Sequence, residues 1–382
     1  MATLDGERQM SFYNSLKAAL GGAAIIFTLG VSGAKPSHAE KIELCVFEWE
    51  GYISPFADDF AAYAKSKGVE AKLTFMTGVD GKPSYITSAD DIFQVVRGEK
   101  CDIVTPTHNY YKDSNARLMQ ILAPINVAEV ANFSAVVDNL RTANYAEAEG
   151  KRYAVPLLGG GYSLAYNADR VKEAPTSWQA LTDPRFKNRT SITGAQYEAN
   201  VYVAALLSGA KPTDVYAWDS INPEAVGGWL RRMAGNARVF WDANPDIDLM
   251  ANDLDLITDY GFGVAFANAK GQNWKFASPA EPTTVWLDNI SLTPSAVATP
   301  AKSKAAHLLL DFMLSPEIQA RLAQMYGVVV PNPKALDHIP AEQRDKVRVG
   351  SNDFYKAELL WRPLDKRTRN GFKGLWDEAA KR

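Results

Sequence analysis

The sequence of 382 residues contains only two cysteines, Cys45 and Cys101, and four histidines. The histidines are scattered without the spacing of zinc sites, so we expect neither a metal centre nor another cofactor. A disulfide would require the two cysteine Cα atoms to lie within about 7 Å. Both residues fall in or at the start of expected strands whose registers look offset, which favours two buried thiols over a bridge.

An excess of positive charge is also missing. Lys and Arg number 41 against 44 Asp and Glu, a formal net charge of -3, so nothing points to nucleic acid as a partner. The composition, 47% hydrophobic and 22% charged, is ordinary for a globular protein, and the length fits one large or two medium domains. Nine Trp and sixteen Tyr provide many rings for a core or for stacking on a cation.

Motifs of nucleophilic or metal-dependent enzymes are absent. The sequence has no G-x-S-x-G elbow, and no cysteine has a histidine partner in a plausible register. A pair of carboxylates is the one catalytic arrangement that the sequence leaves open. We therefore do not expect an enzyme.

The one long apolar run, residues 18–31, follows Lys17 near the N-terminus. It is too short and too glycine-rich to span a membrane comfortably, and small residues at 37–39 resemble a signal-peptidase site. We expect residues 1–39 to be a signal peptide, with Met1 or Met10 as the start. No cysteine stands at the expected cleavage point, after Ala39. The sequence thus predicts a protein released into a bacterial periplasm.

Alternating strand and helix patterns follow the signal segment. A strand over residues 42–47 precedes a helix over 55–67, for which Ser54 is the expected N-cap. After a strand at 71–76, a helix opens at Ser88 with an acidic capping box, and a strand at 102–105 completes a βαβαβ unit. This order predicts an α/β fold with a mostly parallel sheet.

A second α/β block is expected over residues 164–284, with its strongest strand at 260–266. Before it, a strand at 153–158 is interrupted by three glycines, residues 159–161, which could form a hinge or admit a ligand close to the backbone. After it come helices at 303–314 and from 315 to Gly327. Two crossings between the blocks predict two lobes with a cleft between them. We assign residues 40–162 and 286–330 to lobe 1, and residues 163–285 and 331–382 to lobe 2.

The segment 47–52 is the strongest candidate for part of a binding site. It follows a strand and precedes a helix, which is where open α/β sheets bind ligands. Trp49 and Tyr52 can stack on a cation, and Glu48 or Glu50 can pair with its charge. The segment therefore predicts a site for an organic cation. The plain alternative is an ordinary turn with partly buried rings.

The sequence resembles the periplasmic solute-binding proteins of bacterial ABC importers, and among them the spermidine/putrescine-binding family. The resemblance spans the chain after residue 39 and rests on several short motifs that occur in the same order as in the family. These motifs are residues 47–52, 101–107, 153–156, 166–167, 177–178 and 286–288, together with Gly327. It implies the type II periplasmic-binding-protein fold, with two α/β lobes that close on a ligand. It also implies delivery to an inner-membrane permease with a cytoplasmic ATPase, and a monomer suits that role.

The resemblance also implies the residues that line the ligand site. They come from both lobes and are Trp49, Glu50, Tyr52, Thr107, Glu198, Phe266, Trp286 and Asp288. Two positions that are often acidic in the family are neutral here, Gly51 and Ala195, and Asn109 stands where the family often has Tyr. Each candidate also has a plain interpretation as core packing, a helix start or a turn.

These residues predict a small organic amine as the ligand, most simply a polyamine such as putrescine held between Asp288 and Glu198. A monocationic or zwitterionic amine is the alternative, because two acidic positions are neutral and the backbone of residues 159–161 could take a carboxylate. Ferric iron is a weaker alternative, suggested by the adjacent Tyr110 and Tyr111.

Overall fold

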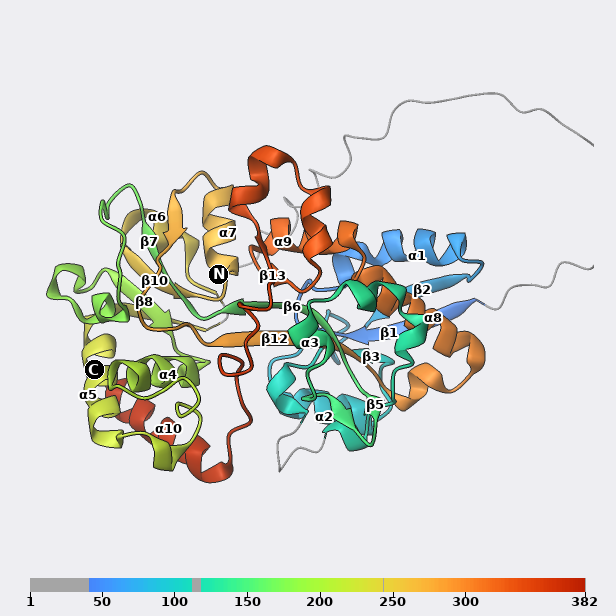
Figure 1. Cartoon of the computed structure of the whole chain (residues 1–382), viewed down its shortest axis with the longest axis horizontal. Helices are drawn as coiled ribbons and strands as arrows, with labels where there is room; N and C mark the ends of the chain where they lie inside the picture. Colours follow the sequence, from blue (N-terminus) through green and yellow to red (C-terminus); the bar gives the residue numbers. More distant parts are fainter. Residues whose placement is uncertain (1–40, 112–117, 243, 382) are drawn as a thin grey trace, which may run out of the picture. The chain divides into compact units, whose positions relative to one another are not determined.

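The structure is a computed structural model that describes residues 41–111, 118–242 and 244–381 (Figure 1). The expected signal peptide and its cleavage point lie outside the described residues. No helix within the described ranges has the length and apolar character needed to cross a membrane. Two larger sheets and their flanking helices make up the fold, which confirms the α/β class.

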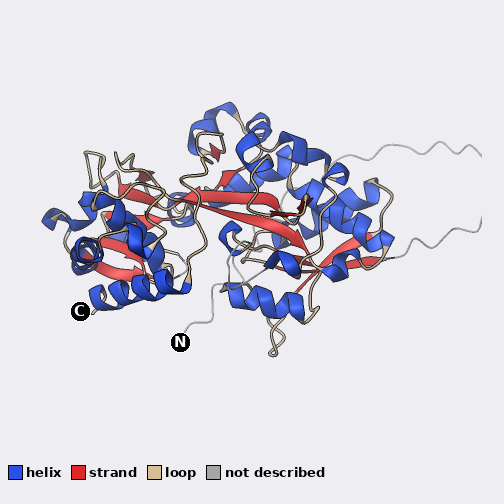
Figure 2. Cartoon of the chain, turned by 60° about the horizontal axis from the view of Figure 1, so that its bottom comes forward, coloured by secondary structure: helices blue, strands red, loops and turns tan. Residues whose placement is uncertain are grey.

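The larger sheet has seven strands in the order β14-β13-β6-β12-β3-β1-β2. Its β1, β2 and β3 are parallel, whereas β12 is antiparallel to both β3 and β6. Helices lie on both sides of this sheet (Figure 2). The strands are β1 (Ile42–Phe47), β2 (Ala71–Phe75), β3 (Ile103–Val104), β6 (Val155–Gly161), β12 (Val285–Leu292), β13 (Val329–Val330) and β14 (Arg348–Val349).

The smaller sheet has five strands in the order β11-β7-β10-β8-β9. They are β7 (Ser163–Asn167), β8 (Thr190–Thr193), β9 (Ala237–Trp241), β10 (Leu256–Asp259) and β11 (Trp274–Phe276). A separate two-stranded ribbon consists of β4 (Glu147–Ala148) and β5 (Lys151–Arg152). Each larger sheet has its own hydrophobic core, which is the physical basis of two lobes.

The helices are α1 (Ala57–Ser66), α2 (Ala89–Arg97), α3 (Asp138–Arg141), α4 (Tyr197–Leu207), α5 (Pro223–Asn236), α6 (Ile247–Asn252), α7 (Phe262–Ala269), α8 (Pro300–Met313), α9 (Pro316–Tyr326) and α10 (Lys366–Ala379). The capping box expected at Ser88 is present at the start of α2, and Gly327 ends α9 with a left-handed φ of 63°. The N-cap expected at Ser54 was wrong. Residues 54–56 form a 3-10 turn whose N-cap is Ile53, and the N-cap of α1 is Phe56, so Ser54 is the N-cap of neither.

Three segments connect the two sheets. β6 continues through Tyr162 into β7, and β12 returns beside β6 with Val285 opposite Gly161 (Figure 1). The third segment precedes α10, and Val285 exchanges backbone hydrogen bonds with Leu359 and Trp361 of this segment. The sequence predicted only the first two crossings, because the third has no strand pattern of its own.

The C-terminal residues divide between the two sheets. We expected residues 331–382 to belong to lobe 2, but β14 pairs with β13 in the seven-stranded sheet. Only α10 packs against α4 and α5, beside the five-stranded sheet. Lobe 1 therefore takes in more of the C-terminal region than we expected, whereas the remaining lobe boundaries stay a prediction.

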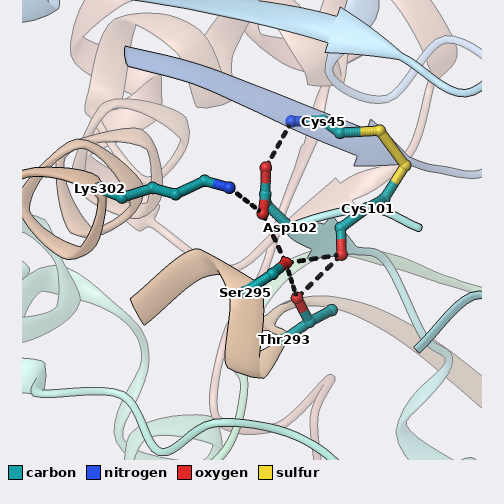
Figure 3. Close-up of a disulfide and its surroundings, with 6 residues drawn as sticks. All are labelled: Cys45, Cys101, Asp102, Thr293, Ser295 and Lys302. Carbon is teal, nitrogen blue, oxygen red and sulfur yellow. Dashed lines mark hydrogen bonds and ion pairs between the residues drawn. A yellow bond between two sulfur atoms is a disulfide. The ribbon is translucent and has the colours of Figure 1, made fainter. Parts of the chain in front are cut away.

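The two cysteines form a disulfide, so the expectation of two thiols was wrong (Figure 3). The Asp102 N–H donates to the Cys45 carbonyl, which extends the β1–β3 pairing beyond β3. The Cys45 and Cys101 Cα atoms consequently lie 4.6 Å apart. Asp102 is buried beside the bridge and binds Lys302 of α8, with 2.6 Å between Oδ1 and Nζ. Its other oxygen accepts the Cys45 N–H at 2.9 Å, so charge and backbone bonds hold the two strands together at the bridge.

Candidate ligand-binding site

The turn after β1 carries two acids that the fold places differently. Glu48 is buried, and its carboxylate accepts the backbone N–H groups of Ile53 and Ser54, where the turn before α1 begins. Burial raises the pKa of Glu48 to about 7, and these hydrogen bonds oppose that rise. Glu50 is exposed on the turn. Glu48 therefore caps the turn and has a structural role. Glu50 is not brought to the cluster of residues around Asp288.

Asp288 of β12 is the centre of the arrangement. It is 4% exposed, and its two carboxylate oxygens accept hydrogen bonds from the Tyr52 hydroxyl at 2.8 Å and the Thr107 hydroxyl at 2.6 Å. Burial raises the pKa of Asp288 to about 7, although both hydrogen bonds favour the charged form. The turn after β1, the segment after β3 and strand β12 thus meet at one buried carboxylate.

Aromatic rings continue from this carboxylate. Trp286 lies two residues before Asp288 on β12, so both side chains point to the same face of the sheet. The Trp286 ring stacks on Phe262 at 6.0 Å between ring centroids, and Phe262 is also parallel to Tyr52 at 6.5 Å. Tyr260 meets the Trp286 ring edge-on at 6.1 Å. Tyr52 and Trp286 belong to the core of the seven-stranded sheet, whereas Tyr260 and Phe262 follow β10 of the five-stranded sheet.

Phe266 is not part of this ring cluster. We expected it in a strand over residues 260–266, but β10 ends at Asp259 and α7 begins at Phe262. Asp259 explains the change, because its carboxylate accepts the N–H groups of Gly263 and Val264 and so caps the helix. The Phe266 ring contacts Tyr326 of α9 instead, at 6.3 Å.

The three glycines at 159–161 belong to β6, so they do not interrupt the strand as expected. Their lack of a side chain lets other groups approach closely. A Cβ on Gly160 would lie 2.8 Å from Trp286 Nε1 and 2.8 Å from the Tyr260 carbonyl oxygen. Glycine is therefore required where the Trp286 indole packs against the crossing strand.

A cavity of about 640 Å³ lies between α2, α4 and the segment leading into α10, and Trp361 of its lining meets the Tyr260 ring at 6.0 Å between centroids. Its lining residues come from both lobes and include Asn109, Tyr110, Glu198, Trp361 and Arg369. A larger cavity of about 840 Å³, lined by residues of the 170–186 segment and by Asp255, contacts none of the candidate site residues. We take the smaller cavity as the ligand site, because chemically suitable groups converge on it.

Glu198, in the first turn of α4, lines this cavity and is half-buried. Burial raises the pKa of Glu198, while a hydrogen bond from Tyr197 and the positive charge of Arg369 lower it. Tyr110 connects the two acids: burial raises the pKa of its hydroxyl, and the charges of Asp288 and Glu198 raise it further. Tyr110 lines the cavity with Glu198, and its turn begins at Thr107, whose hydroxyl is hydrogen-bonded to Asp288.

Trp49 is half-buried behind the ring cluster, and its backbone N–H donates to the Thr105 hydroxyl at 3.0 Å. Tyr111 faces the core, where its hydroxyl is hydrogen-bonded to Ser291, so Tyr110 and Tyr111 do not converge as a pair of iron ligands.

Sequence reasoning missed three residues of the site, namely Phe262, Tyr260 and Arg369. The aromatic run at 260–266 was a signal for the first two, but its periodicity was read as a strand.

Comparison with known proteins agrees with this architecture. Residues 98–357 match the family described as bacterial extracellular solute-binding proteins. The spermidine/putrescine-binding periplasmic protein of Salmonella typhimurium is 24% identical over 318 residues, covering 81% of this chain and 83% of that protein. The putrescine/agmatine-binding protein of Pseudomonas aeruginosa is 23% identical over 364 residues, covering 90% and 92%.

A similar solved structure is the spermidine/putrescine ABC transporter substrate-binding protein of Streptococcus pneumoniae, with a TM-score of 0.70 and 16% identity. The alignment covers 89% of this chain and 98% of that one, and it shows that the fold is the bilobed type II periplasmic-binding-protein fold. With more than half of its length matched by the family, this chain belongs to the bacterial extracellular solute-binding proteins.

Proposed function

We propose that the protein captures a small organic amine of the polyamine class in the periplasm and delivers it to an inner-membrane ABC permease. The relatives named for spermidine, putrescine and agmatine support the ligand class. Their periplasmic location and membership of ABC systems support the compartment and the partner.

The observation that carries this proposal is the environment of Asp288. The two hydrogen bonds to its carboxylate come from neutral hydroxyl groups, Tyr52 and Thr107, and burial keeps its pKa near 7. A buried carboxylate without a cation is unfavourable, and an ammonium group placed against it removes that penalty. The free energy of forming this ion pair then contributes to ligand affinity.

The rings beside Asp288 suit the rest of an amine ligand. Trp286, Phe262 and Tyr52 present aromatic faces next to the carboxylate, and such faces attract both alkyl chains and ammonium groups. Because these rings come from both lobes, a ligand between them favours the closed arrangement. Binding would shift an open–closed equilibrium by the difference in ligand affinity between the two states, and the permease would recognise the closed state.

Isothermal titration calorimetry of the protein with putrescine tests the proposal. Butanediol, which has the same chain length but no charge, is the matched ligand control. We expect putrescine to bind, butanediol not to bind, and Asp288→Asn to lose at least about tenfold in putrescine affinity, because a desolvated charge pair is worth more than one decade. Equal binding of putrescine by the wild type and by Asp288→Asn would contradict the role of this carboxylate.

A further inference from the structure

The charges around the cavity do not match a ligand with two free ammonium groups. Two acids of the lining, Asp90 and Glu198, are balanced by two arginines, Arg97 and Arg369. Asp288 adds one negative charge close to the cavity, because it binds the Thr107 hydroxyl at the start of the turn that carries Asn109 and Tyr110 of the lining. The charged residues at the cavity therefore favour a ligand with a net charge of about +1. Putrescine carries +2, and an ω-amino acid is neutral overall.

Arg369 is the residue that disfavours a second ligand ammonium group beside Glu198. It lies in the first turn of α10, lines the same cavity as Glu198, and is half-buried. A guanidinium group beside Glu198 competes with any ligand ammonium for that carboxylate, and it also repels the ammonium.

Hydrogen-bond donors gather at the same place. Trp361 lines the cavity, and its Nε1–H is buried without a hydrogen-bond partner among the described residues. Tyr260, whose ring lies 6.0 Å from that of Trp361, likewise has a buried hydroxyl for which the described ranges supply no partner. The indole N–H can only donate, so a buried Trp361 Nε1–H without an acceptor favours a ligand oxygen over a ligand ammonium, whereas the Tyr260 hydroxyl can donate or accept.

We propose, resting on the amine function above, that Arg369 is a specificity-determining residue that directs the site to amines with one free ammonium and one amide carbonyl. A mono-acylated diamine has this chemistry. Its ammonium would pair with Asp288, and its carbonyl oxygen would accept hydrogen bonds from the Trp361 indole and the Arg369 guanidinium. Glu198 would remain paired with Arg369 and would not bind the ligand directly.

The test measures calorimetric affinities of putrescine, N-acetylputrescine and an ω-amino acid of similar length for four proteins. These are the wild type, Arg369→Gln, Arg232→Gln and Trp361→Phe. Arg232→Gln is the matched control, because it removes the same charge from an exposed position outside this cavity, where the Arg232 guanidinium stacks on Trp229 of α5. Trp361→Phe removes the indole donor and keeps an aromatic ring.

We expect wild-type protein to bind N-acetylputrescine at least about tenfold more tightly than putrescine, and the ω-amino acid more weakly than either. Arg369→Gln should reverse this preference by strengthening putrescine binding, whereas Arg232→Gln should leave it unchanged. Trp361→Phe should weaken the binding of N-acetylputrescine alone.

Putrescine binding that equals or exceeds that of N-acetylputrescine in the wild type would overturn the inference. An unchanged preference in Arg369→Gln, or the tightest binding by the ω-amino acid, would overturn it as well. In each of these cases a loss of affinity in Asp288→Asn would leave the amine function standing. If none of the three ligands bound the wild type, the proposed function and the inference would fail together.

Discussion

The Tyr52 hydroxyl donates a 2.8 Å hydrogen bond to Asp288, although the two residues are 236 positions apart in the sequence. This bond joins the turn after the first strand to the strand that returns from lobe 2. The Phe262 ring, which comes after the end of β10, lies parallel to the Tyr52 ring and stacks on it. The Asp288 carboxylate is therefore held by side chains from the N-terminal third of the chain, Tyr52 and Thr107.

Replacing Asp288 by Asn should stabilise the ligand-free protein while it weakens amine binding. The folded-state pKa of about 7 lies above the ordinary value of 3.8, so ionised Asp288 destabilises the fold by up to about 4 kcal/mol at pH 8. This destabilisation is absent below the unfolded pKa, grows as pH rises, and is complete above the folded pKa. Urea unfolding of Asp288→Asn and wild-type protein at pH 5 and pH 8 measures the difference.

The gain in unfolding free energy from Asp288→Asn should be large at pH 8 and much smaller at pH 5. A variant that is less stable than the wild type at pH 8 would show that the carboxylate has a structural role.

Amine affinity should rise with pH between 5 and 8. Only ionised Asp288 pairs with an ammonium group, and the ligand ammonium remains protonated over this range. Below the Asp288 pKa of about 7, the affinity should fall by roughly tenfold per pH unit, and binding near pH 7 should release protons. Calorimetry in two buffers of different ionisation enthalpy measures this release. A flat pH profile with no proton release would mean that another group holds the ligand.

The neighbouring acids Glu48 and Glu50 form a matched pair for separating structure from binding. Glu48→Ala should lower the free energy of unfolding by about 1–3 kcal/mol, because it leaves the buried N–H groups of Ile53 and Ser54 without their acceptor. Glu50→Ala should change stability by less than about 0.5 kcal/mol, since Glu50 is exposed. Urea unfolding and putrescine titration of both variants are the measurements. Tenfold weaker binding by Glu50→Ala would return this residue to the ligand site.

Gly160→Ala should weaken both the fold and amine binding. Its new methyl group would lie 2.8 Å from Trp286 Nε1 and from the Tyr260 carbonyl, so the indole or the crossing strand must shift. We expect a destabilisation of about 1–3 kcal/mol together with weaker putrescine binding. Gly235→Ala on α5 is the control, because no atom lies within 4 Å of its added Cβ. Thermal unfolding of both variants, with and without putrescine, tests this. An unaltered ligand-induced shift in Gly160→Ala would contradict a role for Trp286 packing.

Local signals in the sequence predicted much of the fold. The strand at 42–47, the capping box at Ser88 and the helix end at Gly327 follow from alternation, capping and glycine chemistry, and the structure confirms all three. The strand expected at 260–266 was wrong because Asp259 starts a helix that aromatic periodicity does not reveal. Here a side chain that caps the helix prevails over strand propensity.

The ligand site was less accessible to sequence reasoning. Nothing local distinguishes Glu48 from Glu50, because the turn geometry decides which carboxylate is buried. The approach of Arg369 to Glu198 depends on how α10 packs beside α4, and segments so distant in the chain give no periodic signal. Asp288 and Trp286 were found through family resemblance, and the structure places them together on one strand.

A crystal structure of the protein with the tightest-binding amine would show directly whether Asp288 holds the ligand. We expect a ligand ammonium nitrogen within hydrogen-bond distance, about 3 Å, of an Asp288 carboxylate oxygen, with the ligand chain against Trp286 and Phe262. A ligand bound elsewhere, with Asp288 contacting only Tyr52 and Thr107, would show that this carboxylate does not bind the amine.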